Sequence, residues 1–357
     1  MFGFGRKNRA LLGIDISSTA IKLIELTRST GVIADPFRVV AFAVEPLPVN
    51  AVVEKRLADV DAVGQAIRKA VLKSGTSAKR AAVAVSGSSV ITKVITMADG
   101  LSESEMEALI QLEADQYIPY PLEEVNIDFD VLGPSSSGVD MVDVLLAASR
   151  RENVDDRVAA LEMAGLAAEI VDVEAYAMED ACSLLLGYLG DGAQKQTVAV
   201  ADVGATVTTL HVMQNGASVY TREQNFGGQQ LLDEVQRRYR LTPEEALGRL
   251  TSGDLPEAYQ TEVLGPFKDA LAQQIARARQ FFYSSSRFDR TDHIILAGGC
   301  ARISGVDQVV EARLGCPVTI ADPFQHMSME PHVDSAGLAQ AAPTMMTAVG
   351  LALREFV

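Results

Sequence analysis

The chain has 357 residues, of which 48% are hydrophobic and 22% charged, and this composition suits a folded globular protein of two α/β lobes. Its 31 basic and 47 acidic residues give a formal charge of −16, and a field of that sign repels nucleic acid and anionic lipid headgroups. We therefore exclude nucleic acid as a partner and expect membrane contact only through another protein.

The first half of the chain begins with a predicted β-hairpin. Residues 11–16 and 21–26 are short apolar runs separated by Ser17, Ser18, Thr19 and Ala20. Hydrophobic periodicity predicts further strands at 38–44, 80–85 and 168–173, and helices at about 61–73, 151–164 and 174–188.

Between residues 89 and 149 the order changes to strand, helix, strand, strand, which indicates a compact insertion. The expected strands are 89–97, about 126–132 and 140–148. A capping box of Ser102 and Glu105 starts the helix, which prolines end beyond Tyr117. The corner formed by Tyr117, Ile118, Pro119 and Tyr120 is either simple helix termination or a surface for a partner.

Residues 189–196 contain no apolar run and are interpreted as a connector between lobes. The pattern of the first half then restarts, with runs at 197–203 and 207–213 around Gly204, Ala205 and Thr206. Beyond them we expect helices at about 227–240, 243–251 and 266–287, a strand at 292–297, a long loop at 322–343 and a helix at about 344–356.

The two small-residue turns suit phosphate binding, because backbone N–H groups must reach phosphate oxygens without side-chain bulk in the way. Each turn follows a carboxylate at a strand end, Asp15 or Asp202, and Lys22 is placed to reach back toward the phosphates. The pair Gly298-Gly299 would let the backbone approach an adenine closely. Two ordinary hairpins are the alternative, but the repetition favours a site for a triphosphate with magnesium.

Several segments carry a resemblance to a known superfamily. In order, GIDISSTAIKL, VDVEAY, VADVGATVTTL, ILAGGCARISGV and TAVGLALR resemble the five nucleotide-site segments of actin-like ATPases. Within the FtsA-like branch, LEADQYIPYPLEEVNIDFDVLG is most similar to the PilM family of type IV pilus assembly proteins.

This resemblance implies an α/β actin-like ATPase fold, with two RNase H-like lobes and an FtsA-type inserted subdomain in the first. The expected parts are 1–88 as first-lobe core, 89–149 as the inserted subdomain with a partner-binding groove alongside, 150–195 as first-lobe core continued, 196–235 as second-lobe core, 236–289 as a helical subdomain of the second lobe, 290–340 as second-lobe core continued, and 341–357 as a C-terminal helix packing on the first lobe.

The resemblance also implies roles for individual residues around ATP and Mg²⁺. Asp15 and Asp202 would face the metal through water, and Glu174 would position the attacking water. Phosphate contacts would come from Ser17, Ser18, Thr19, Lys22, Gly204, Ala205 and Thr206. Adenosine contacts would come from Gly298, Gly299, Arg302, Glu234 and Arg238. Relatives usually carry glycine where this chain has Ser17, so its turn must avoid a positive φ there.

The implied function is an ATP-binding scaffold, at most a weak ATPase, that grips the N-terminal cytosolic peptide of PilN. It would be cytoplasmic, peripheral to the inner membrane through this partner, and would couple the pilus assembly platform to motor ATPases, as a monomer or a homodimer. Three unpaired cysteines and the lack of a secretion signal or an apolar run of ~18 residues agree with that location. The alternatives are a small-molecule kinase of the same fold, with Asp172 or Glu174 as base, and an FtsA-like filament former.

Overall fold

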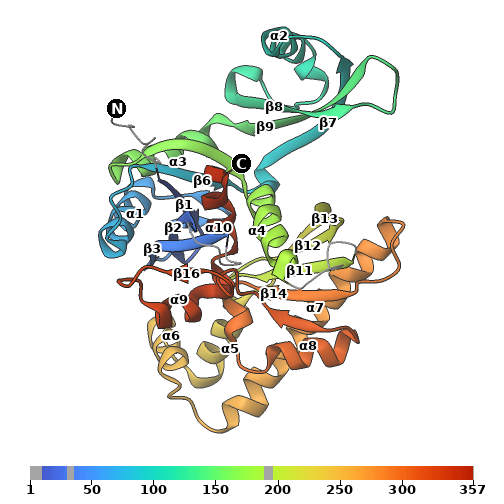
Figure 1. Ribbon diagram of the computed structural model, residues 1–357. Coiled ribbons are helices and arrows are strands. Elements are labelled where there is room, and N and C mark those ends of the chain that lie inside the picture. Colours follow the sequence, from blue (N-terminus) through green and yellow to red (C-terminus); the bar gives the residue numbers. More distant parts are fainter. Residues whose placement is uncertain (1–9, 30–35, 189–195, 357) are drawn as a thin grey trace.

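Two β-sheets form the framework of the molecule (Figure 1), a computed structural model that describes residues 10–29, 36–188 and 196–356. Of the predicted connector at 189–196, residues 189–195 lie outside these ranges. The first sheet has the strand order β10–β6–β1–β2–β3–β16. Its strands are β1 (Leu11–Ile16), β2 (Ala20–Arg28), β3 (Phe37–Pro46), β6 (Arg80–Val85), β10 (Ala167–Val173) and β16 (Ser328–Met329).

The second sheet repeats the central arrangement of the first. Its order is β13–β12–β11–β14–β15, built from β11 (Thr197–Val203), β12 (Thr208–Gln214), β13 (Ala217–Gln224), β14 (His293–Ala297) and β15 (Val318–Ile320). In both sheets an antiparallel meander of three strands is joined by parallel strands on one side, β1 pairing with β6 and β11 with β14. The registers correspond too, since Asp15 lies opposite Lys22 and Asp202 opposite Thr209.

Two helices, α4 (Glu174–Tyr188) and α10 (Met346–Leu353), lie between the sheets (Figure 1). One hydrophobic cluster combines their side chains with buried residues of both sheets, such as Ile24 from β2 and Val200 from β11. The helices approach so closely that a Cβ at Gly350 would overlap the backbone carbonyl of Ala177. This shared core fixes the two hairpins relative to each other.

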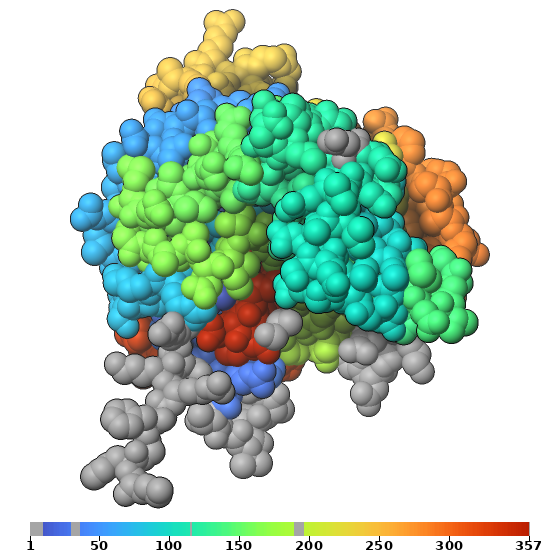
Figure 2. All heavy atoms as spheres, turned by 90° about the horizontal axis from the view of Figure 1, so that it is seen from above, coloured from blue at the N-terminus to red at the C-terminus, as the bar shows by residue number. Residues whose placement is uncertain are grey.

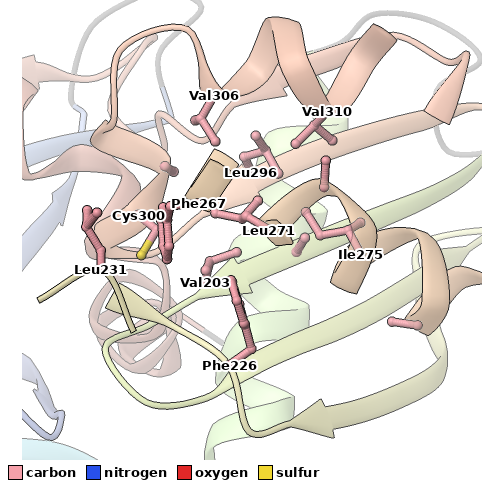
Figure 3. Packing of buried hydrophobic residues seen from close by; sticks show 14 of the residues in the cluster. Val203, Phe226, Leu231, Phe267, Leu271, Ile275, Leu296, Cys300, Val306 and Val310 are labelled. Atoms are coloured by element: carbon pink, nitrogen blue, oxygen red, sulfur yellow. The ribbon is translucent and has the colours of Figure 1, made fainter. Parts of the chain in front are cut away.

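The outer faces of the sheets are covered by separate sets of helices. On the first, α1 (Val60–Ser74) and α3 (Arg151–Met163) bury a cluster that includes Leu12, Leu23 and Ile67. On the second lie α5 (Gly228–Tyr239), α6 (Pro243–Ser252), α7 (Gly265–Ser285) and α8 (Val306–Leu314). Figure 3 shows the core of this second lobe, in which the rings of Phe226 and Phe267 stack with centroids 5.5 Å apart.

The insertion forms its own small layer, standing away from the body of the molecule (Figure 1). It contains β7 (Val90–Ala98), α2 (Glu103–Glu113), β8 (Val125–Pro134) and β9 (Met141–Arg150), and its sheet has the order β7–β9–β8. The predicted element order is confirmed, as is the capping box of Ser102 and Glu105. Figure 2 shows it in teal beside the light-green segment that follows it, with red C-terminal residues visible between them.

The segment 322–343 differs from the predicted loop. It contains β16, which pairs in parallel with β3, and α9 (Ser335–Ala341), whose N-terminus Asp334 caps. The strand is only two residues long and the helix seven, so neither shows a measurable period in the sequence. The elements α8, β13 and β15 were also not predicted, nor was the hairpin of β4 (Val52–Val53) and β5 (Arg56–Leu57). In β13 half-buried polar residues alternate with exposed ones, so no apolar run marks it.

Shorter segments complete the described chain. They are 3₁₀ turns at Gly87–Ser89, Ala114–Gln116, Leu122–Glu124, Gly299–Arg302, Ala342–Thr344 and Arg354–Phe356, and a π-helical turn at Gln260–Leu264. No single helix within the described ranges is long and apolar enough to cross a membrane, and Ser335–Thr344 with Met346–Phe356 reach that length and composition only as a pair bent by 96°.

The close approach of α10 to α4 gives a prediction. Gly350→Ala should lower the free energy of unfolding by about 3 kcal/mol, because the added methyl group meets backbone that cannot move without disturbing the shared core. The matched control is Gly248→Ala in α6, where a Cβ meets nothing within 4 Å and helix propensity favours alanine by roughly 1 kcal/mol. Urea unfolding of both variants measures the difference; equal midpoints would show that α10 adapts to the methyl group without loss of stability.

Candidate functional site between the two sheets

The turns at the tips of the two hairpins share a backbone hydrogen bond between their first and fourth residues. In the first, the N–H of Ser17 donates to the carbonyl of Ala20 at 3.1 Å; in the second, the N–H of Gly204 donates to the carbonyl of Val207 at 3.0 Å. Among the described residues, no acceptor is found for the N–H groups of the two central residues of either turn. These residues are Ser18, Thr19, Ala205 and Thr206. Each turn therefore presents two free donors, the arrangement that an anion requires.

Ser17 takes the place of the usual glycine without backbone strain. Its φ is not positive, as a residue with a Cβ requires. Its hydroxyl donates to the carbonyl of Ala20 at 2.7 Å and also accepts the N–H of Ala20 at 3.3 Å. The side chain thus tightens the turn from inside and leaves the amides of Ser18 and Thr19 without a bond to it.

The second turn rests on the N-terminus of α5. The N–H of Gly228 donates to Gly204, and the N–H of Gln229 to Ala205. A Cβ at Gly227 would overlap the carbonyls of Gly204 and Ala205, so glycine is required for this close approach. Below the turn, Val203 and Phe226 point into the core of the second lobe (Figure 3).

The strand-end carboxylates of Asp15 and Asp202 lie close enough for their charges to act on one another. Lys22 Nζ lies 2.7 Å from Asp15 Oδ2. No described residue donates a hydrogen bond to the side chain of Asp202, yet Asp202 is close enough to Lys22, Asp15, Lys55 and Glu174 for their charges to act on it. Desolvation raises the pKa of Asp202 to about 6, with Lys22 opposing and Asp15 adding to the effect. The structure therefore brings Asp15, Asp202, Lys22 and Glu174 into one site.

Gly298 allows the end of β14 to pass directly beside Asp202. Its φ is 84°, and a Cβ there would overlap Asp202 Oδ1 and the carbonyl of Val203. Its N–H donates to the carbonyl of Pro343 at 2.7 Å, which ties the strand end to the segment that leads into α10. Glycine is thus needed both for the backbone conformation and for the room around the carboxylate.

Two residues of the site were not predicted from the sequence. Lys55 Nζ lies 2.9 Å from Glu174 Oε2 and 2.7 Å from Glu223 Oε1, which joins the β4–β5 turn of the first lobe to β13 of the second. A small cavity of about 50 Å³ lies beside them. Its lining includes Lys55, Glu174, Asp202, Thr209, His211 and Glu223. No local motif marks Lys55 or Glu223, because the contact spans 168 residues of sequence.

A larger cavity of about 410 Å³ lies at the other end of the site. It is lined by Gly299, Arg302, Ile303, Ala339, Gln340 and Pro343. The structure thus places Gly299 and Arg302 together next to Gly298. Glu234 and Arg238 line neither cavity: Glu234 pairs with Arg237 on the same helix, and Arg238 pairs with Glu262. Their contacts with an adenosine stay a prediction.

Comparison with known proteins gives a match over nearly the whole chain. Residues 13–356 match the family model described as "Type IV pilus assembly protein PilM". The chain belongs to the PilM family. A solved structure of a "PilM-PilN type IV pilus biogenesis complex" is 27% identical to it, covers 97% of this chain and 98% of that one, and superimposes with a TM-score of 0.77. The ethanolamine utilization protein EutJ from Carboxydothermus hydrogenoformans shares the fold, with 17% identity, 96% and 88% coverage and a TM-score of 0.56.

The two-lobed architecture of this PilM-family chain is therefore the actin-like ATPase fold, as its sequence predicted. The carboxylates of the site suit magnesium only as an ion held largely through water and phosphate. Among the described residues no three His, Cys, Asp or Glu side chains are grouped as metal ligands. Asp15 and Asp202 suit an ion that keeps most of its water and takes further ligands from phosphate oxygens, which is the usual coordination of Mg²⁺.

The corner of the inserted subdomain is partly core and partly surface. Ile118 is buried with Ala114 and Val125 in the subdomain core. Tyr117 is half-buried beneath Lys93, whose Nζ is 4.1 Å from the ring centroid. Pro119 and Tyr120 are exposed, and the guanidinium of Arg150 stacks over Tyr120 at 4.3 Å. Of the four corner residues, only these last two offer a free surface.

The raised pKa of Asp202 gives a prediction with a defined sign. The folded state holds the proton of Asp202 more tightly than the unfolded chain does, so the ionisation of this group lowers stability as pH rises from about 4 to about 6. Asp202→Asn removes the charge and should stabilise metal-free protein by about 2 kcal/mol at pH 8, but by almost nothing at pH 4. Thermal unfolding in EDTA at both values measures this; a variant less stable than wild type at pH 8 would show that the carboxylate is well solvated.

Proposed function

We propose that this chain binds ATP with Mg²⁺ between its lobes and acts as a scaffold in type IV pilus assembly. The observation that carries the proposal is the pair of equivalent turns, each with two free N–H donors and a strand-end carboxylate, in one shared site. A triphosphate needs many donors around its oxygens and a cation between them, and this arrangement supplies the first and suits the second.

In this proposal each part of the site has one task. The amides of Ser18, Thr19, Ala205 and Thr206 would receive the phosphate oxygens. Lys22 would add a point charge after leaving Asp15, whose carboxylate would then share the water shell of the metal with Asp202. The larger cavity beside Gly299 and Arg302 would take the base, since it combines apolar walls with the polar ends of Arg302 and Gln340.

We further propose that the partner is the N-terminal cytosolic peptide of PilN, held beside the inserted subdomain. Membership of the PilM family and the likeness to the 27% identical PilM-PilN complex support this partner. The subdomain also exposes apolar side chains that a peptide would cover. These are Val94, Leu109, Leu112, Tyr120, Val131 and Leu132. Through PilN the chain would be peripheral to the inner membrane and would couple the assembly platform to motor ATPases.

The structure weighs against a small-molecule kinase. A kinase needs a free base beside the acceptor hydroxyl. Asp172, one candidate, forms an ion pair with Arg354 at 2.7 Å, and its Oδ1 accepts the N–H of Val173. Glu174, the other candidate, is paired with Lys55. Neither carboxylate is available in this arrangement.

The test is calorimetric binding of ATP and Mg²⁺ to wild type and to Asp202→Ala. We expect binding by wild type and at least a roughly tenfold loss in the variant, because the metal loses one of its two carboxylates. Asp254→Ala, at an exposed loop position, is the matched control and should bind like wild type. The peptide of PilN should bind wild type, with an affinity that ATP changes by about 5-fold or more, a usual size for coupling between sites.

Three outcomes would contradict the proposal. Wild type that binds no ATP would remove the nucleotide from the function, and equal affinity of Asp202→Ala would remove Asp202 from the site. Phosphoryl transfer to a small acceptor at about 1–100 s⁻¹ would make the chain a kinase.

A further inference from the structure

Lys55 occupies a central place in the site although nothing in the sequence marks it. Its Nζ contacts Glu174 at the first turn of α4 and Glu223 on β13, at 2.9 Å and 2.7 Å. The three side chains are only 24–30% exposed, so water screens this triad less than it screens a surface ion pair. One arm of the triad stays within the first lobe, and the other crosses to the second.

The backbone of Lys55 lies in a tight turn between two paired strands. Val53 pairs with Arg56, and the two residues between them form a tight turn in which Glu54 and Lys55 have φ values of 49° and 63°. Two successive positive φ values in a two-residue turn are typical of type I′ hairpins, which non-glycine residues adopt at some cost. The strain indicates that the position of Lys55 is fixed by its surroundings.

A buried arginine supplies that fixation. Arg157 on α3 is 3% exposed. Its guanidinium donates to the carbonyl of Lys55 at 3.1 Å, to that of Ala84 at 2.7 Å and to that of Asn153 at 2.8 Å. All these acceptors are backbone carbonyls, so Arg157 anchors the turn to β6 and α3, while its charge acts on Glu174 without a hydrogen bond to it. The ammonium group of Lys55 is thereby directed into the space between the lobes.

The charge of Lys55 is stable in this setting. Burial lowers its pKa, but Glu174 and Glu223 outweigh burial and the net direction is upward. The other titratable side chains that line the same cavity are Asp202 and His211. Desolvation lowers the pKa of His211 to about 4, so this ring is neutral near pH 7 and leaves Lys55 as the cation of this end of the site.

We propose that Lys55 is a positioning residue that holds Glu174 and Glu223 together across the cleft, and so keeps the lobes closed and the carboxylate of Glu174 occupied. Two consequences follow. The link between the lobes through Lys55 and Glu223 is made by protein groups alone. Glu174 is also unable to act on a water molecule while Lys55 neutralises it, and this second consequence rests on the proposed ATP-binding function.

The first test uses nucleotide-free full-length protein and hydrogen–deuterium exchange. Lys55→Met keeps the length of the side chain and removes its charge, and Glu223→Gln breaks only the arm that crosses the cleft. Both should speed exchange on the order of 5-fold in peptides covering 52–57 and 217–224, because a partly shielded ion pair is lost. Lys55→Arg keeps the charge and should restore most of the protection.

Matched controls separate this effect from general destabilisation. Lys73→Met removes a lysine whose Nζ donates to the carbonyl of Val44 within the first lobe, and it should leave both peptides unchanged. Exchange across β9 of the inserted subdomain is the internal reference for folding. The proposal would be overturned if exchange in Lys55→Met were indistinguishable from exchange in Lys73→Met. It would also be overturned if Lys55→Met and Lys55→Arg lost equal protection while Glu223→Gln lost none.

The second test measures ATP affinity and hydrolysis in the same variants. Hydrolysis by Lys55→Met should rise about 3-fold or more as Glu174 is released, and the added Glu174→Gln should cancel the gain. If wild type binds ATP but Lys55→Met hydrolyses it no faster than wild type does, the effect on Glu174 is refuted. If wild type binds no ATP, the proposed function fails, while the exchange experiment still decides whether Lys55 closes the cleft.

Discussion

The hydrophobic contact between the two sheets is the constraint on which the site depends. Each turn is a local structure that its own hairpin forms, but two turns make one site only if the sheets carrying them are held at a fixed distance and angle. Helices α4 and α10 provide this by filling the space between β2 and β11 with apolar side chains. The fit is close enough to require glycine at position 350, where backbone meets backbone. The candidate site is therefore built upon a closely packed apolar core.

What the sequence predicted well was local. The turn residues 17–20 and 204–206, the carboxylates before them and the glycines after β14 are neighbours in the chain, so their residue types directly reflect backbone needs such as small size or positive φ. The element order of the inserted subdomain was predictable for the same reason, since β9 alternates regularly and the helix starts at a capping box. In these places local preference and the final fold agree.

What escaped prediction depends on distant contacts. Lys55 meets partners 119 and 168 residues away, and no property of the segment around it reveals their identity. The pairing of Arg238 with Glu262, 24 residues further along the chain, is another such contact. Likewise, β16 is a strand only because β3 offers it a free edge. The periodicity of residue types along the sequence carries no information on such pairings.

Electrostatic balance explains why this site has so few free cations. Four carboxylates, Asp15, Asp202, Glu174 and Glu223, face two lysines, Lys22 and Lys55, and each lysine already contacts a carboxylate within 2.9 Å. The cluster is thus negative before any ligand enters, and a triphosphate would add charge of the same sign. Lysines alone cannot resolve this conflict, because moving one toward phosphate uncovers the carboxylate that it leaves. A divalent cation held by that carboxylate and by phosphate would satisfy both at once, as the proposed function requires. Desolvation raises the pKa of Asp202, and such an ion would offset this cost.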